Sequence, residues 1–254
     1  MRMKPIASVE LGQPDGPVVV FAHGWGRTHA DFLPVAELIA GQARCILFDL
    51  PGFGETPRPD EAWDTHDYAD HMRRVLADKL GDQPCIWVGH SFGGRVGLRL
   101  AAQPQSPISH MVIAAGAGVK LPPSTWKQLR GQWRSAMFKR KKARATDEYE
   151  IIALEKEYGS ADYVHSREIG MRDIFLQTVK EDQTNEVGRI IAPTHLIYGS
   201  KDTATPPAEG RVLHAHIPHS TYTECPEFDH LSILTRGRHQ IANVIKDILT
   251  EAAQ

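Results

Sequence analysis

Ser91 lies in the stretch Cys85 to Gly94, which reads CIWVGHSFGG. Four apolar residues of β-prone character lead into Gly89-His90-Ser91-Phe92-Gly93, and an amphipathic run follows at once. This order predicts a strand, a tight turn and a helix, with glycines that let the two backbones approach each other. A serine there takes a strained conformation and presents its hydroxyl at the edge of a sheet, near the amides that begin the helix. The alternative is a glycine-rich turn without chemical use, but the strand–turn–helix context favours a nucleophile.

Asp202 and His230 each follow a predicted strand, as Ser91 does. Because parallel strands end on one edge of a sheet, residues far apart in the sequence can converge there. A serine hydroxyl is a weak nucleophile at neutral pH, so an imidazole must take its proton and a carboxylate must orient that imidazole. The order Ser91, Asp202, His230 therefore predicts nucleophilic catalysis by a triad.

Competing residues are weaker candidates for these roles. Among the 13 histidines, His230 is distinguished by its place in the loop after the last predicted strand. Asp49 ends a strand before a Pro-Gly turn, where aspartate more often caps local backbone amides. Asp229 is adjacent to His230, so we expect its side chain to point elsewhere.

The loop His23-Gly24-Trp25-Gly26 ends a continuous apolar run that begins at Val18. Such a run is typical of a strand buried on both faces. Glycines at its end free backbone N–H groups to point at a ligand, as an oxyanion hole requires. For His23 itself we expect a structural hydrogen bond within the loop.

The elements that must position these residues alternate between strand and helix up to Gly116, which predicts βαβ units and a mostly parallel sheet. Expected strands cover residues 6–11, 18–23, 45–50, 85–88, 110–116, 194–200 and 221–225. Expected helices cover residues 30–40, 65–80 and 231–249, with further helices after Ser91 and after Pro206-Pro207. The predicted fold is an α/β, doubly wound sheet.

Residues 119–188 interrupt this pattern, because they show no convincing strand and are rich in charged side chains with scattered aromatics. A structureless loop of that length is rare, so we expect a helical cap between core segments 1–118 and 189–254. Helical spacing is clearest at 126–137 and 169–179, and Trp126 and Trp133 are possible substrate contacts. The basic cluster at 139–144 is most simply a solvated helix face, and the sharper hypothesis is a docking patch for an acidic carrier protein.

Composition excludes several classes of protein. A formal net charge of -2 gives no reason to expect nucleic acid or an anionic membrane as a partner. The 3 cysteines form no paired framework, and no spacing typical of a metal site is present, so we expect no metal and no cofactor. The N-terminus lacks an apolar signal core, and no run is long enough to span a bilayer, which predicts a soluble cytoplasmic protein.

Taken together, these motifs resemble the α/β-hydrolase superfamily. The resemblance is carried by HGWG at 23–26, DLPGFG at 49–54, GHSFG at 89–93, YGSKD at 198–202 and DHL at 229–231. It covers the chain except for the insertion, whose position is similar to that of the family's helical cap. It implies Ser91 as nucleophile, His230 as general base and acid, and Asp202 as the orienting acid. It also implies an oxyanion hole formed by the backbone N–H groups of Trp25 and Phe92.

The reaction that the resemblance implies is hydrolysis of a small-molecule ester by a capped serine carboxylesterase. An aspartate would be expected at the turn of dehalogenases and epoxide hydrolases, so those branches are disfavoured. Three alternatives remain: a meta-cleavage-type carbon–carbon bond hydrolase, an esterase acting on a methyl ester carried by an acyl carrier protein, and a ligand receptor that retains the triad. The meta-cleavage hydrolases usually have Asn where His90 stands.

Overall fold

A seven-stranded sheet forms the core of the protein. The structure is a computed structural model that describes residues 5–121 and 125–252. In helix α4 (Thr125–Lys142) it describes the side chains from Trp133 onward. The strands are β1 (Ser8–Gly12), β2 (Val18–Ala22), β3 (Arg44–Phe48), β4 (Cys85–His90), β5 (Ile108–Ala114), β6 (Thr194–Gly199) and β7 (Ser220–Cys225). Their spatial order is β1-β3-β2-β4-β5-β6-β7, and all neighbours are parallel except β1, which is antiparallel to β3. The predicted fold class is confirmed.

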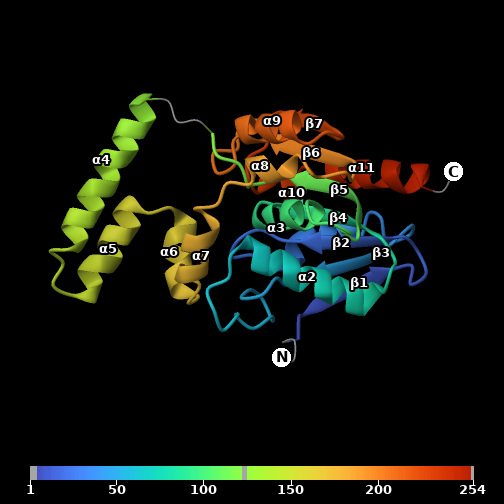
Figure 1. Cartoon of the computed structure of the whole chain (residues 1–254), viewed down its shortest axis with the longest axis horizontal. Coiled ribbons are helices and arrows are strands. Elements are labelled where there is room, and N and C mark those ends of the chain that lie inside the picture. The colour runs from blue at the N-terminus through green and yellow to red at the C-terminus, as the bar shows by residue number, and fades with distance from the viewer. Residues whose placement is uncertain (1–4, 122–124, 253–254) are drawn as a thin grey trace.

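Helices cover both faces of this sheet (Figure 1). Outside the insertion they are η1 (His29–Phe32), α1 (Leu33–Ala36), α2 (Thr65–Leu80), α3 (Phe92–Ala101), α9 (Pro207–His216), α10 (Ser232–Thr235) and α11 (Arg238–Glu251). All residues of β2 are buried, and alternate residues enter different cores: Val18 and Val20 pack with α2 and α3, whereas Val19 and Phe21 pack with α1 and α11. This two-sided burial explains why the central strands read as continuous apolar runs.

Between β5 and β6 the chain forms the helical insertion: α4 (Thr125–Lys142), α5 (Glu148–Tyr158), α6 (Ala161–Glu168), α7 (Arg172–Thr178) and α8 (Thr184–Val187). The α4–α5 hairpin stands away from the sheet, and α6 and α7 lie between that hairpin and the core (Figure 1). Glu155 joins these helices, because its buried carboxylate accepts hydrogen bonds from Lys142, Arg167 and Arg172. Burial alone would raise the pKa of Glu155, but these cations lower it to about 2.

The end of the insertion is anchored to the core through Arg99 of α3. Its side chain is only 4% exposed and forms ion pairs with Glu181 and Glu186. Glu181 also accepts a hydrogen bond from the backbone N–H of Thr65, at the start of α2. A buried cation needs such compensation, so this network fixes where the chain re-enters the sheet.

Three predicted helices differ from the observed ones. The helix expected at 30–40 is the 3-10 turn η1 followed by the short α1, whose first turn contains Pro34, a residue that lacks an N–H donor. The helix expected at 169–179 begins at Arg172, since Gly170 has a φ of 68°. The terminal helix expected at 231–249 is divided at Gly237 into α10 and α11.

Candidate active site

The turn between β4 and α3 holds Ser91 at a positive φ, with φ 48° and ψ -107°. An L-residue adopts this region only under strain, which is typical of functional turns. Close packing around the turn requires glycine on both sides. A Cβ on Gly89 would lie 2.7 Å from the carbonyl oxygen of Gly93, and a Cβ on Gly93 would lie 2.0 Å from that of Ala22. The close backbone contacts of Gly89 and Gly93 therefore fix the position of Ser91 at the start of α3.

The loop after β2 packs directly against this turn. The Gly93 N–H donates to the carbonyl of His23 over 3.0 Å, and a Cβ on Gly24 would lie 3.5 Å from the Cβ of Ser91. The backbone N–H groups of Trp25 and Phe92 donate to no described residue. Two unused donors thus flank Ser91, as stabilisation of an oxyanion would require.

Asp202 and His230 meet beside this turn. The Nδ1–H of His230 donates to Oδ2 of Asp202 over 2.7 Å. The other carboxylate oxygen, Oδ1, accepts from the backbone N–H groups of Ala204 and Thr205 at 2.8 and 2.9 Å. Burial would raise the pKa of Asp202, but the hydrogen bonds from His230 and Thr205 lower it below its usual value. The carboxylate is therefore both ionised and fixed in orientation.

Two neighbours hold this pair in place. The hydroxyl of Thr205 lies 2.9 Å from Oδ2 of Asp202 and 2.9 Å from the carbonyl of Ala115. The His90 Nε2–H donates to the backbone carbonyl of His230 over 2.9 Å, and the two rings are in contact, with centroids 4.7 Å apart. His90 is fully buried, and burial lowers its pKa to about 3, so its ring is neutral. The loop that carries His230 is thereby tied to the end of β4, directly before Ser91.

The competing residues have structural roles, as predicted. His23 accepts from the Leu50 N–H at Nε2, and its Nδ1–H donates to the carbonyl of Gly24. Asp49 accepts from the backbone N–H groups of His29 and Glu55. Asp229 accepts from the N–H groups of Leu231 and Ser232 and so caps α10.

Ser91 and His230 open into one cavity of about 740 Å³ between the sheet edge and the insertion. Its apolar wall includes Phe92 and Phe175, whose rings both pack edge-on against Trp25. Its polar wall includes Arg95, Lys120, Asp162, Glu181, Thr205 and Glu209. The insertion contributes to the cavity through α6 and α7, and no described residue of α4 or α5 lines it. This site combines an apolar surface with a few convergent polar groups, as small-molecule sites do.

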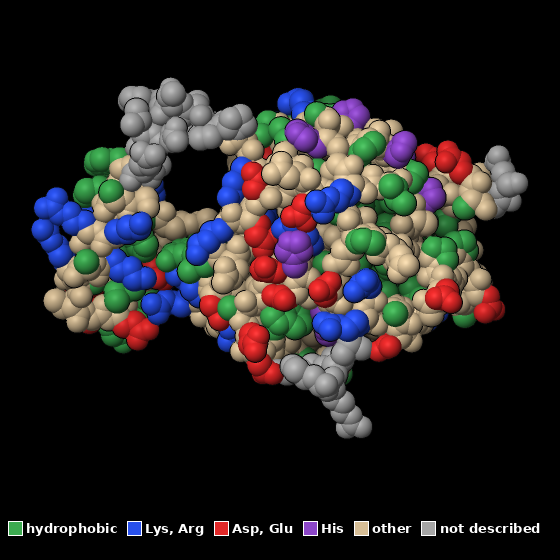
Figure 2. Space-filling view, in the orientation of Figure 1, with side chains coloured by type: hydrophobic (Ala, Val, Ile, Leu, Met, Phe, Trp, Pro, Cys, Tyr) green, Lys and Arg blue, Asp and Glu red, His purple; other side chains and the backbone are tan. Residues whose placement is uncertain are grey.

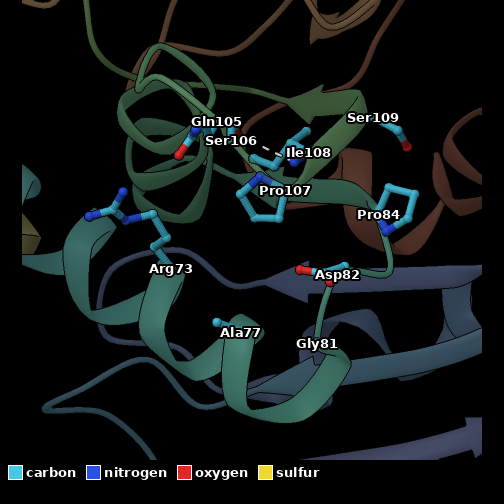
Figure 3. Close-up of a pocket in the computed structure, with 10 residues that line it drawn as sticks. All are labelled: Arg73, Ala77, Gly81, Asp82, Pro84, Gln105, Ser106, Pro107, Ile108 and Ser109. Atoms are coloured by element: carbon cyan, nitrogen blue, oxygen red, sulfur yellow. Dashed lines mark hydrogen bonds between the residues drawn. The ribbon is translucent and has the colours of Figure 1, made fainter.

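A second hollow, of about 630 Å³, lies between the end of α2 and the segment that leads into β5 (Figure 3). Its lining includes Arg73, Asp82, Ser106 and Ser109, but no histidine. It is at the edge of the sheet where β4 and β5 begin, opposite to the edge that carries Ser91. We assign it no chemistry.

The sequence did not single out Thr205, Arg95 or the contact between His90 and His230. The Asp-x-x-Thr spacing at 202–205 is a local signal for Thr205, whereas the other contacts depend on residues far apart in the chain. Of the two tryptophans named as possible substrate contacts, Trp133 is 64% exposed and does not line the cavity. The side chain of Trp126 lies outside the described part of α4.

Comparison with known proteins gives consistent matches. The sequence profile of the family described as alpha/beta hydrolase fold matches residues 17–237. A pimeloyl-[acyl-carrier protein] methyl ester esterase of Chromobacterium violaceum is 28% identical over 255 residues, which cover 95% of this chain and 97% of that protein.

Solved structures share the same fold. The enol-lactonase from Burkholderia xenovorans superposes with a TM-score of 0.72 at 22% identity, over 96% of each chain. A thermophilic esterase from Thermogutta terrifontis gives a TM-score of 0.70 at 18% identity, over 97% of this chain and 93% of that one.

Proposed function

The chain belongs to the alpha/beta hydrolase family, and on this basis we propose that it is a serine carboxylesterase that cleaves small to medium esters through an acyl-enzyme. The observation that carries the proposal is the hydrogen bond from His230 to the fixed carboxylate of Asp202, at the wall of the cavity into which Ser91 opens. Within the described residues, no cluster of His, Cys, Asp and Glu is arranged to hold a metal ion, and no helix is long and apolar enough to cross a bilayer.

In the proposed mechanism, the Oγ of Ser91 attacks the ester carbonyl carbon while Nε2 of His230 takes the hydroxyl proton. The tetrahedral oxyanion accepts hydrogen bonds from the N–H groups of Trp25 and Phe92. The imidazolium of His230, stabilised by Asp202, then gives its proton to the leaving alcohol. Water attacks the acyl-enzyme by the same route, which releases the acid and restores Ser91.

The test is steady-state hydrolysis of p-nitrophenyl esters of graded acyl length by the wild type and by Ser91→Ala. We expect turnover with a maximum at one chain length in the wild type and none above background in the variant. Ser106→Ala, in the hollow at the other edge of the sheet, is the matched control and should retain full activity. A fluorophosphonate probe should add its mass to the wild type and to Ser106→Ala only.

Persisting hydrolysis in pure Ser91→Ala would refute the assignment of the nucleophile. If the wild type hydrolyses no ester, ring-fission dienones test the carbon–carbon hydrolase. Slow turnover or a persistent acyl-enzyme would favour the ligand receptor.

A second candidate is an esterase that acts on an ester carried by an acyl carrier protein, the activity named for the Chromobacterium relative. The observation in its favour is the basic last turn of α4, where Lys139 and Arg140 are exposed, with Arg144 just beyond (Figure 2). None of these three cations has an ion pair with a described residue, whereas Lys141 and Lys142 pair with Glu157 and Glu155. An acidic carrier would find complementary charge on this surface.

Charge reversal tests this second candidate. In the triple variant K139E/R140E/R144E, we expect a higher KM for a carrier-bound ester and an unchanged KM for the free methyl ester. The KM of the wild type for the carrier-bound ester should depend on salt concentration, and that of the triple variant should not. Arg73→Glu with Arg74→Glu, exposed on α2, is the control, with two charge reversals against the three at the end of α4. Equal KM values for the carrier-bound ester in all three proteins would exclude docking on α4.

A further inference from the structure

Arg95 lies one helical turn after Ser91, because its backbone N–H donates to the carbonyl of Ser91 over 3.0 Å. Residues four apart lie on the same face of a helix. The side chain of Arg95 accordingly lines the same cavity as Ser91 and His230. It is a cation built into the wall of the site and not a surface residue that happens to be nearby.

The guanidinium of Arg95 has little of its hydrogen-bonding capacity used. Its Nη1 donates to the carbonyl of Thr178 over 2.6 Å, and none of its other donors has a partner among the described residues. No described carboxylate forms an ion pair with it. Burial lowers its pKa, which reflects the cost of keeping this charge out of water, although a guanidinium stays protonated.

Arg99, one turn further along α3, shows how the fold treats a buried arginine with a structural role. It is paired with Glu181 and Glu186 and has a further hydrogen bond to Thr65. Arg95 is half-buried and has no such ionic partners in the described part of the chain. Even partial removal of a charge from water is costly without them, so the retention of Arg95 needs another reason. The contrast between two arginines of one helix indicates that Arg95 is left with open donors toward the cavity.

The acids of the cavity do not neutralise Arg95 by contact. Glu181 is held by Arg99 and Thr65. Burial raises the pKa of Glu209 to about 7, although Arg95 opposes this, and burial also raises the pKa of Asp162. Both carboxyls are thus shifted toward their neutral forms, and the guanidinium remains a charge that an anion from solution can pair with.

We propose that Arg95 binds a carboxylate of the substrate, and that the preferred substrates are esters which carry a second, ionised carboxyl group. A guanidinium matches a carboxylate because two parallel N–H donors can face its two oxygens. The inference rests on the proposed esterase function and names its substrate class. Arg95 acts as a specificity-determining residue.

The experiment compares monomethyl and dimethyl esters of succinic, glutaric and adipic acids, which differ in one negative charge at constant chain length. A parallel set, acetyl esters of hydroxy acids and of their methyl esters, places the charge on the alcohol side. For the wild type, we expect kcat/KM to be at least about tenfold higher for the charged member of the pair in one of the two sets.

Arg95→Met should lower the ratio of kcat/KM for charged to neutral substrate by about 10- to 100-fold, the value of a hydrogen bond to a charged group. Arg95→Lys should retain part of the ratio, since it keeps the charge but loses the paired donors. Lys120→Met removes the other cation of the cavity, which is exposed, and should change the ratio by less than about threefold.

An unchanged ratio in Arg95→Met, or no preference for the charged ester in the wild type, would overturn the inference while leaving the esterase proposal intact. An equal loss on both substrates would assign Arg95 a structural role. If the wild type hydrolyses no ester, the esterase proposal fails, and calorimetric titration of succinate, glutarate and adipate into the wild type and Arg95→Met still decides. Binding that requires Arg95 supports the carboxylate site, and equal or absent binding in both proteins refutes it.

Discussion

Asp202→Asn should leave the fold intact and remove most of the activity, because the structure dictates which way the new amide must point. Oδ1 of Asp202 accepts from two backbone N–H groups, so the amide oxygen must occupy that position. The NH₂ group then takes the place of Oδ2 and faces Nδ1 of His230. Two donors cannot face each other, so His230 carries its proton on Nε2, where it is unable to accept the proton of Ser91.

The magnitude follows from the interactions that the productive tautomer would lose. Restoring Nδ1–H beside the amide leaves buried donors unpaired, at a cost of about 1–3 kcal/mol. The lost hydrogen bond between imidazolium and carboxylate removes a further contribution of about 1.5–3 kcal/mol. Together these predict a decrease in kcat of roughly 10² to 10⁴-fold. The hydroxyl of Thr205 can donate to the carbonyl of Ala115 and accept from the new amide, so the unfolding temperature should change little.

The assay is kcat for the best p-nitrophenyl ester, with the thermal unfolding temperature measured on the same samples. Asp229→Asn is the matched control, because Asn also caps helices and Asp229 lies next to His230 in the sequence without contacting its ring nitrogens. It should retain full activity. If kcat of Asp202→Asn falls less than about tenfold, the assignment of Asp202 as the orienting acid is wrong.

Two further predictions concern stability. Gly93→Ala should prevent folding or lower the free energy of unfolding by more than about 3 kcal/mol, because its Cβ would lie 2.0 Å from the backbone oxygen of Ala22. The control Gly41→Ala, whose Cβ would have nothing within 4 Å, should have a free energy of unfolding within about 0.5 kcal/mol of the wild type. Equal unfolding midpoints of the two variants in urea would contradict this. The free energy of unfolding should decrease by about 2 kcal/mol per group between pH 7.5 and pH 5. The pKa values of His23 and His90 are lowered to about 4 and about 3 in the fold, so both stay largely neutral there while the unfolded chain binds protons near 6.5. Urea titrations at pH 7.5, 6 and 5 measure this, and a stability that rises toward pH 5 would refute it.

Much of the fold could be predicted because its signals are local. The continuous apolar runs of β2, β3 and β5 reflect burial on both faces of a parallel sheet, a condition that each run satisfies by itself. Helix α2 was predicted with its observed bounds from its apolar spacing and from Gly81, which ends it with a φ of 60°; the structure adds Asp64 as the cap at its start. The helix at 30–40 was predicted too long, and the one at 231–249 was predicted as continuous, because apolar spacing continues through Pro34 and Gly237 while the regular helix does not.

The sequence by itself determined the strained turn at Ser91, since two close backbone approaches can be met only by the glycines at 89 and 93. It also indicated Asp202 and His230, because each follows a strand whose end lies on a known edge of the sheet. Only the tertiary structure decided which of the two arginines on α3 is compensated and which is open to the cavity. That distinction depends on Glu181 and Glu186, which lie near the C-terminal end of the insertion and form ion pairs with Arg99 but not with Arg95. Pairing of charges across such distances is set by packing, and no local pattern in the sequence encodes it.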